Sequence, residues 1–453
     1  MKLTFHGGAK MVTGANYLLE ADNSIGGVTK ILIDCGLRQG SGFAEHQNFE
    51  PFPYNPKDIE AVFVTHAHID HTGLLPKLYK DGFRGKIYST TATKGFAEAL
   101  LLDSEHILSL EAERSRKPLL YQEEDVFETM KLWKGIGYHE PVDIGAFRVE
   151  LYDAGHILGS AFIKVESGGK SIVFSGDLGN YPAPIIKETE KLPEVDYCLI
   201  ESTYGDRVHE DVGRRREMLE DTIEDTVRVG GVLIIPAFAM ERTQQLLFEL
   251  NELVEHGRIP RVPIYIDSPL AIKLTKIYKN FTSYFNKETS GIVKSGDDIL
   301  QFPGLHMTLT TQESKSIAEV KPPKVVIAGS GMSQGGRILY HEKKYLSDPK
   351  NTILFIGFQA KGSMGREILD GAKTVKILHE DVPVKARAVM ISGYSAHADQ
   401  PRLVNWLKSA RMGLKKVFVV QGEENSADIL AAKISDELAI HTEIPNKGES
   451  VEL

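Results

Sequence analysis

The chain has 453 residues, of which 42% are hydrophobic and 25% are charged, and its formal net charge is −9. This composition excludes a largely disordered chain. The negative charge argues against a protein that binds nucleic acids through a generally basic surface, because non-specific affinity comes mostly from lysine and arginine at phosphates. The length exceeds that of a usual single domain, so we expect two domains or one large domain with an insertion.

No apolar stretch approaches the ~20 residues that span a bilayer, and the first residues do not form an apolar signal segment. We therefore expect a soluble, cytoplasmic protein. The two cysteines, Cys35 and Cys198, are too few for a disulfide framework, and each lies in or beside an apolar run. We expect both to be buried free thiols.

Short apolar runs alternate with helical patterns along almost the whole chain, which is typical of α/β layering. The apolar runs predict strands at residues 30–34, 61–65, 147–152, 171–175, 232–236, 264–267, 324–328, 352–357, 388–392 and 416–420. Residues 91–127 form a charged helical pattern, Leu219, Ile223 and Val227 share one helix face, and a further helix begins near Glu241. The arginines at 214–216 lie among acidic residues, so we interpret them as a solvated, salt-bridged helix face.

The strongest motif is Thr-His-Ala-His-Ile-Asp-His at residues 65–71, directly after a predicted strand and before an apolar helix. It concentrates four side chains that can bind a metal: His66, His68, Asp70 and His71. His66 and His68 point the same way if the strand period continues, and the other two turn as the helix begins. Three histidines and an aspartate in one turn have no comparable explanation in packing alone, so we predict a zinc site.

This turn cannot complete a catalytic zinc site, because such sites use about three protein ligands and an open position. Three further candidates follow other strands in glycine-rich segments: His156 in DAGHILGS, Asp177 in SGDLGN and His397 in SGYSAHAD. Each alone is more often an ordinary polar group at a strand end. Together they predict the missing ligands.

The THAHIDH, GHILGSA and SGDLGN segments resemble the successive motifs of the metallo-β-lactamase superfamily. Glu201 in ESTYGDR, His341 in GMSQGGRILYH and His397 in SAHADQ look like the extra motifs of its β-CASP subgroup, whose members process RNA or DNA. The likeness covers essentially the whole chain. It is most similar to the RNA-cleaving branch that includes the nuclease subunit of the eukaryotic cleavage and polyadenylation factor and its compact prokaryotic relatives.

The resemblance implies a four-layer αββα metallo-β-lactamase fold with an inserted α/β, Rossmann-like β-CASP domain. The expected boundaries are residues 1–205 and 372–453 for the two parts of the metallo-β-lactamase domain and residues 206–371 for the insert. It also implies two zinc ions. The first would be held by His66, His68 and His156, the second by Asp70, His71 and His397, and Asp177 would bridge both.

Two zinc ions suit phosphodiester hydrolysis by a hydroxide held between them, and the resemblance implies that the substrate is RNA and that Asp177 helps to orient the hydroxide. We expect His341, paired with Glu201, to protonate the departing ribose oxygen. Without the family likeness His341 would be taken for an exposed helix histidine. The sequence leaves open whether cleavage is endonucleolytic or also 5′-to-3′ exonucleolytic. The set of histidines and carboxylates is also not exclusive to zinc.

Single-stranded RNA needs groups that hold phosphates and bases. Glycine-rich turns and helix starts in the predicted insert offer such groups. The candidates are Phe238, Arg242, Ser330, Gly331, Met332, Ser333, Arg337, Lys361 and Arg366. Each basic residue among them has an equal alternative as a surface or capping charge.

Two other functions compete with the ribonuclease. Other members of the superfamily hydrolyse small esters, thioesters or β-lactams, although the predicted insert would cover the metal site and suits a strand of nucleic acid better. A catalytically inactive RNA-binding subunit ranks last, because every ligand that the resemblance requires is matched. The resemblance also suggests that the protein forms a homodimer.

Overall fold

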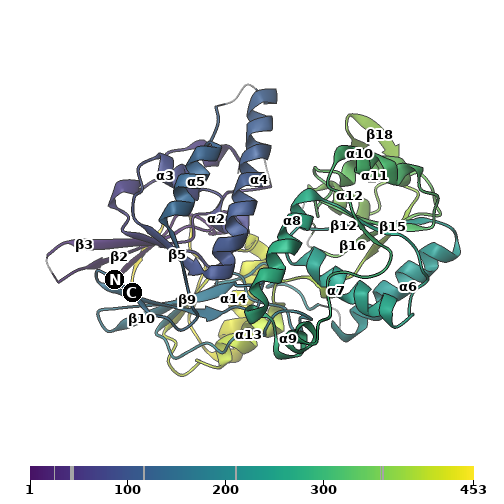
Figure 1. Cartoon of the computed structure of the whole chain (residues 1–453). Coiled ribbons are helices and arrows are strands. Elements are labelled where there is room, and N and C mark those ends of the chain that lie inside the picture. Colours follow the sequence, from purple (N-terminus) through teal and green to yellow (C-terminus); the bar gives the residue numbers. More distant parts are fainter. Residues whose placement is uncertain (25, 41–44, 116–117, 210–211, 358, 360–361) are drawn as a thin grey trace. The chain divides into compact units, whose positions relative to one another are not determined.

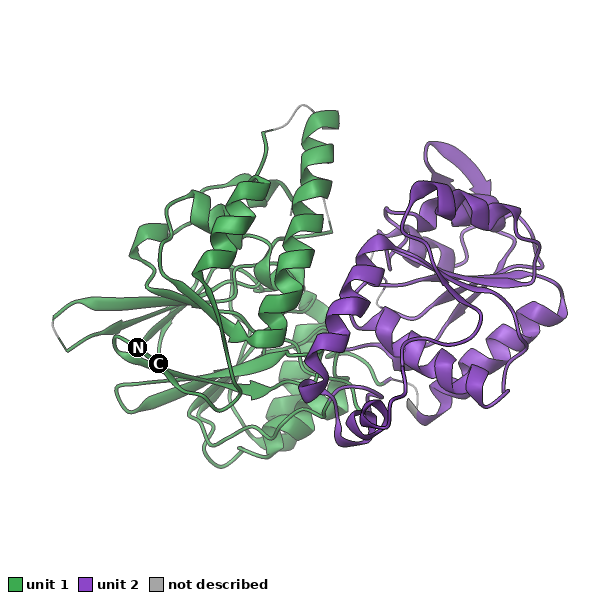
Figure 2. Ribbon diagram, in the orientation of Figure 1, with its two compact units in different colours: residues 1–181, 187–208, 397–453 green, residues 182–186, 209–396 purple. Residues whose placement is uncertain are grey.

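The computed structural model describes residues 1–453 except residue 25 and residues 41–44, 116–117, 210–211, 358 and 360–361. The chain forms two compact units, coloured separately in Figure 2. Unit 1 contains residues 1–181, 187–208 and 397–453, and unit 2 contains residues 182–186 and 209–396. Unit 2 is therefore an insertion within unit 1.

Unit 1 contains two seven-stranded sheets. The first has the order β22 (Ser450–Glu452), β1 (Lys2–Phe5), β2 (Tyr17–Asp22), β3 (Val28–Ile33), β4 (Ala61–Phe63), β5 (Lys86–Thr90) and β6 (Trp133–Ile136). The second has the order β21 (Thr442–Glu443), β20 (Lys416–Val420), β11 (Tyr197–Glu201), β10 (Lys170–Phe174), β9 (Ala161–Ser167), β8 (Phe147–Asp153) and β7 (Val142–Ile144). Parallel pairs β3–β4, β10–β11 and β11–β20 bring several strand ends to one edge.

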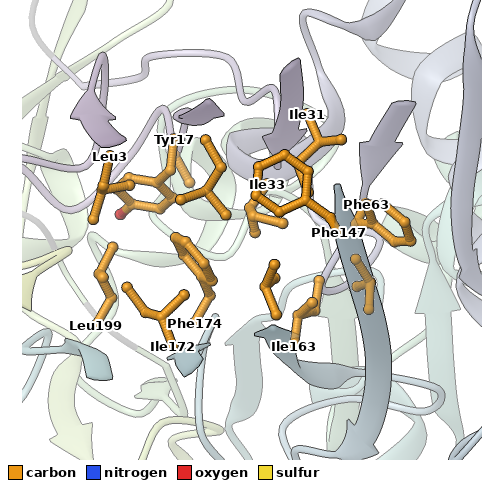
Figure 3. Close-up of a cluster of buried hydrophobic side chains, with 14 of the residues drawn as sticks. Leu3, Tyr17, Ile31, Ile33, Phe63, Phe147, Ile163, Ile172, Phe174 and Leu199 are labelled. Carbon is orange, nitrogen blue, oxygen red and sulfur yellow. The ribbon is translucent and has the colours of Figure 1, made fainter. Parts of the chain in front are cut away.

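The main core of unit 1 lies between these two sheets, as Figure 3 shows. Ile31, Ile33 and Phe63 of the first sheet face Ile172 and Phe174 of the second. Alternate residues of β8 are buried, as expected for strands with one face on the core. Burial of each large apolar side chain contributes about 1.5–3 kcal/mol, so this layer contributes strongly to the stability of unit 1.

Helices cover the outer faces of both sheets (Figure 1). The helices of unit 1 are α2 (Ile69–Thr72), α3 (Leu75–Lys80), α4 (Thr91–Ser115), α5 (Glu123–Leu132), α13 (Gln400–Lys408) and α14 (Glu424–Leu438). Helix α4 packs on β5 and β6. Leu407 of α13 and Ile434 of α14 share a second core with Val417 and Val419 of β20. These layers confirm the predicted αββα arrangement.

Unit 2 is built on a parallel sheet. Its order is β14 (Leu305–Met307), β13 (Ile264–Asp267), β15 (Lys324–Ala328), β12 (Val232–Pro236), β16 (Thr352–Phe355) and β19 (Arg387–Met390). Every residue of β12 and β15 is buried, which requires cover on both faces of the sheet. The helices are α6 (Arg215–Arg228), α7 (Arg242–Glu255), α8 (Pro269–Tyr278), α9 (Lys287–Lys294), α10 (Thr311–Ser316), α11 (Ile338–Tyr345) and α12 (Met364–Leu369). This is the predicted Rossmann-like architecture.

Unit 2 continues beyond residue 371, where the insert was predicted to end. Residues 372–396 belong to unit 2, where a small hairpin of β17 (Thr374–Ile377) and β18 (Glu380–Pro383) precedes β19. Strand β19 pairs with β16 in parallel, so it completes the sheet of unit 2. The apolar run at residues 388–392 indicated a strand but not the sheet that it joins.

Three smaller expectations can be compared with the structure. Both cysteines are free and buried, as predicted. Arg215 is buried, which corrects the interpretation of residues 214–216 as a wholly solvated face; Arg214 and Arg216 are exposed. Within the described part of the chain, no helix combines the length and apolar character that crossing a membrane requires.

Candidate metal centre

The loop between β4 and α2 carries four of the predicted ligands: His66, His68, Asp70 and His71. Backbone contacts fix this turn against the segment that follows β3, where Cys35 N–H donates to the carbonyl of His71 at 2.9 Å. A Cβ at Gly36 would lie 1.6 Å from the carbonyl oxygen of Asp70, so this approach requires glycine. The turn is therefore set by packing against β3 as well as by its own sequence.

The remaining candidates in unit 1 follow other strands. His156 lies after β8 and Asp177 after β10, and the two loops touch so closely that a Cβ at Gly179 would lie 1.9 Å from the carbonyl of Gly155. An isolated antiparallel bridge pairs Gly179 with His397, just before α13. Three segments distant in sequence thus meet the His66 turn.

Four donor atoms form one tight group. Nδ1 of His68 lies 3.1 Å from Nε2 of His66 and 3.4 Å from Nε2 of His156. Oδ2 of Asp177 lies 3.5 Å from Nε2 of each of these two histidines. A tetrahedral zinc ion bonded at about 2.0–2.1 Å places its donors about 3.3 Å apart, so this set fits zinc.

The other carboxylate oxygen of Asp177 faces a different histidine. Oδ1 of Asp177 lies 3.5 Å from Nε2 of His71, and Oδ2 of Asp70 lies 3.8 Å from the same nitrogen. On the far side of this ring, Nδ1 of His71 lies 2.7 Å from Oδ2 of Asp34. Asp34 orients the ring as the carboxylate partners of metal-binding histidines do, so that Nε2 faces Asp70 and Asp177.

Burial and neighbouring charges set the protonation of these groups. Burial lowers the pKa of His66 well below its usual value, which keeps it neutral as a ligand must be. Burial alone would raise the pKa of Asp177, but the surrounding histidines, His71 and His397 foremost, hold it well below its usual range. Asp177 is therefore a carboxylate at neutral pH.

Glu201 pairs with His397. Oε1 of Glu201 accepts a hydrogen bond of 2.6 Å from the backbone N–H of Leu178, and Oε2 lies 3.2 Å from Nδ1 of His397. The same Nδ1 lies 3.8 Å from Oδ2 of Asp177, so these three side chains form a second group of potential metal donors. Burial lowers the pKa of His397, but the carboxylates of Glu201 and Asp177 outweigh it and raise the pKa to about 9.

His341 has a carboxylate partner within its own unit, and its predicted pairing with Glu201, which belongs to unit 1, stays a prediction. Nε2 of His341, on α11, lies 2.7 Å from Oδ2 of Asp267 at the end of β13 in unit 2. Asp267 also accepts bonds from Thr308 and Arg337, both at 2.7 Å. His341 is buried and not an exposed helix histidine. Strand β13 supplies its partner through a parallel pairing with β15 that the sequence does not reveal.

Several predicted RNA-binding residues of unit 2 make contacts within that unit. Arg242 is buried and donates to the side chain of Gln245 and the carbonyl of Tyr394. Arg337 donates to Asp267 and to the carbonyls of residues 308 and 309. The hydroxyl of Ser333 donates to Glu342, inside the unit. These contacts use the groups that we expected to hold phosphates.

The other candidates remain nearer to the surface. The Ser330 hydroxyl accepts from the backbone N–H groups of residues 334 and 335, and Met332 is half-buried. The half-buried ring of Phe238 packs against the buried backbone of Gly331, where a Cβ would approach it to 2.6 Å. Arg366 is exposed and pairs with Asp370. Lys361 lies outside the described residues.

Two residues of the centre escaped the sequence argument. Asp34 ends a predicted strand, like the predicted ligands, and that position could have identified it. Gln421 follows β20, and its Nε2 lies 2.9 Å from Nε2 of His71 and 3.2 Å from Oδ1 of Asp177. A glutamine has no signal as a zinc ligand, so only the structure places it here.

Three family models match the chain. Residues 29–229 match a beta-lactamase superfamily domain, residues 243–368 a Beta-Casp domain and residues 381–445 a Zn-dependent metallo-hydrolase RNA specificity domain. Ribonuclease TTHA0252 of Thermus thermophilus is 39% identical over 426 residues, which cover 94% of each chain. The chain belongs to the β-CASP ribonuclease family. It is thus a metal-dependent hydrolase of the metallo-β-lactamase fold.

Other members of this β-CASP family are similar over nearly the whole chain. The RNase J-like protein of Methanocaldococcus jannaschii is 32% identical and covers 98% of both chains. Transcription termination factor FttA of Methanosarcina mazei is 30% identical over 100% of this chain and 72% of its own. A solved protein of unknown function from Enterococcus faecalis V583 shares the fold, with a TM-score of 0.53 at 13% identity over 100% of this chain and 99% of its own.

Proposed function

We propose that this protein is a ribonuclease that hydrolyses phosphodiester bonds of single-stranded RNA at a centre of two zinc ions. One observation carries the proposal: the two oxygens of Asp177 face different histidine groups, Oδ2 toward His66 and His156 and Oδ1 toward His71. A carboxylate shared in this way is what a two-metal centre requires. The names of the relatives, which include a ribonuclease and an RNase J-like protein, support RNA as substrate.

The donors fit two ions. His66, His68 and His156 would hold the first, Asp70 and His71 the second, and Asp177 both. When bound, two zinc ions supply a water molecule acidified toward neutral pH and positive charge for the phosphate oxygens. Asp34 keeps the His71 ring in its ligating orientation.

His397 is suited to protonate the leaving ribose oxygen. Its Nδ1 is held by the fully buried carboxylate of Glu201, which orients the ring and favours the imidazolium form. The His397 side chain is 20% exposed, so it borders the surface that a substrate reaches. These contacts support His397 in the role that we expected of His341. Its predicted role as a zinc ligand is the competing assignment.

Zinc analysis of a His397→Ala variant separates these two assignments. A proton donor can be removed without loss of metal, whereas removal of a ligand lowers the zinc content. We expect two zinc ions per chain in both the wild type and the variant. A variant with only one zinc would make His397 a ligand.

Incubation of the zinc-loaded protein with a 5′-labelled single-stranded RNA tests the function. We expect cleavage that a chelator removes and that zinc restores, and the product lengths distinguish endonucleolytic from 5′-to-3′ exonucleolytic action. A His68→Ala variant provides a matched control, because it removes one donor of the first group. Intact RNA at full zinc occupancy would contradict the proposal.

The same protein should be offered small ester, thioester and β-lactam substrates. Turnover of these with no RNA cleavage would favour the small-molecule hydrolase, and RNA binding without any turnover would favour the inactive subunit.

Light scattering tests the homodimer, and fractionation of cells tests the cytoplasmic location.

A further inference from the structure

We infer that Gln421 is the fourth protein donor at the second metal position and makes that position the weaker of the two for zinc. This inference rests on the two-zinc centre proposed above. The amide end of Gln421 stands beside His71 and Asp177, at 2.9 Å and 3.2 Å from the ligand atoms of these two residues. Its side chain is buried, with a relative exposure of 2%.

The backbone of Gln421 is fixed independently of its side chain. Its N–H donates to the carbonyl of Gly8 at 2.6 Å, and its carbonyl accepts from the N–H of Ser202 and the hydroxyl of Thr203. The residue follows β20 with a φ of 46°. These contacts direct the side chain toward the centre, and they do not depend on which side chain is present.

The four groups around the second position have the spacing of donors around one ion. Nε2 of His71 lies 2.9 Å from the Gln421 amide, 3.5 Å from Asp177 and 3.8 Å from Asp70. The first position has separations of 3.1–3.5 Å. Gln421 therefore occupies the place that the third histidine has at the first position.

The amide nitrogen of Gln421 is aimed at lone pairs that a metal would use. Nε2 of Gln421 donates to Oδ1 of Asp177 and lies 2.9 Å from Nε2 of His71, the ring atom that would bind a metal, while Nδ1 of the same ring contacts Asp34. A 180° rotation about the last side-chain bond exchanges Nε2 and Oε1. Gln421 then offers its carbonyl oxygen to an ion at the same point.

The donor types differ between the two positions. The first has three imidazole nitrogens and one carboxylate oxygen, whereas the second has one imidazole nitrogen, two carboxylate oxygens and a neutral amide oxygen. Imidazole suits zinc, while carboxylate and carbonyl oxygens suit manganese and magnesium. A metal at the second position must also displace the hydrogen bonds of the amide. The second zinc should therefore leave first, and Mn²⁺ should replace it preferentially.

Metal content measured by mass spectrometry during dialysis against rising chelator concentrations tests the inference. We expect the wild type to lose zinc in two steps separated by about 10–100-fold in free zinc, the range typical when a partner of a metal site changes. Gln421→His should strengthen zinc binding at the second position, so that both zinc ions leave in a single step. Gln421→Leu should weaken zinc binding there and move the two steps further apart. Gln47→His, which adds a histidine away from the centre, should match the wild type.

A second readout uses manganese. With equal Zn²⁺ and Mn²⁺, we expect the wild type to bind one of each and Gln421→His to bind two zinc ions. Simultaneous loss of two zinc ions from the wild type and all variants would overturn the role of Gln421 and leave the two-zinc ribonuclease intact. A wild type that binds no zinc would overturn both. Thermal unfolding of the chelated proteins confirms that the variants fold.

Discussion

Nδ1 of His397 lies 3.2 Å from Oε2 of Glu201, and the other oxygen of this carboxylate accepts a hydrogen bond from the backbone N–H of Leu178. Glu201 has no exposed surface, so its charge acts on His397 with little solvent screening. The pair joins the end of β11 to the segment before α13, which are separated in sequence by residues 209–396 of unit 2.

The first prediction compares two histidines. His397→Ala should lower the rate of RNA cleavage by about 10²–10⁴-fold, because it removes the proton donor, while two zinc ions stay bound. His341→Ala should retain cleavage within about tenfold, since Asp267 keeps its bonds from Thr308 and Arg337. Single-turnover rates on one labelled RNA measure both. A greater loss in His341→Ala than in His397→Ala would restore the assignment made from the sequence.

The second prediction concerns the orientation of His71. Asp34→Asn should weaken zinc at the second position by about 10–100-fold, because an amide no longer fixes the Nδ1–H tautomer of His71. Asparagine tolerates the left-handed backbone of residue 34, whose φ is 60°, so the fold should persist. Zinc titration measures the effect. An equal loss of zinc affinity at both positions would contradict a role of Asp34 that is confined to orienting His71.

The third prediction concerns the buried arginine of α6. Nε of Arg215 lies 2.7 Å from Oε1 of Glu249. The other oxygen of Glu249 accepts a hydrogen bond from the hydroxyl of Tyr394. Arg215→Ala leaves a buried carboxylate without its cation and should destabilise unit 2 by about 3–5 kcal/mol. Arg216→Ala, next to it and exposed, should change stability by less than about 0.5 kcal/mol. Urea unfolding followed by circular dichroism measures both, and equal effects would contradict the buried pair.

The fourth prediction concerns pH. Burial raises the pKa of Glu342 to about 8, although the hydrogen bond from Ser333 opposes this shift, so the folded carboxyl holds a proton at pH 7. Because the folded pKa exceeds the unfolded one, this group stabilises unit 2 fully below about pH 4.5. That contribution is lost as the pH rises to about 8, at up to ~1.4 kcal/mol per pH unit.

Glu342→Gln keeps the shape and the acceptor for Ser333 but cannot ionise. Its melting temperature should therefore fall less than that of the wild type between pH 5 and pH 8, by calorimetry. Glu380→Gln, at an exposed carboxylate that pairs with Lys343, provides the control and should follow the wild type. Parallel pH profiles for the wild type and Glu342→Gln would show that Glu342 is ionised in the fold.

The sequence by itself predicted the four side chains that the structure brings together as a possible first metal position, and the strands that carry them. His66 and His68 share a two-residue period, and His156 and Asp177 follow strands, so local order and strand topology together predict their meeting. The apolar runs also predicted an α/β protein, because burial of alternate or continuous runs depends on residue type along the chain, and the resemblance implied the two layered architectures.

Only the tertiary structure decided which polar groups become partners. Glu201 meets His397 because β10 and β11 pair in parallel and the segment after β10 bridges to His397. Asp267 meets His341 because β13 pairs in parallel with β15, and the sequence does not encode either neighbour locally. Burial of Arg215 and the approach of Gln421 to His71 have the same origin. A charge or an amide has no periodic signal, and its partner is fixed only when distant elements pack.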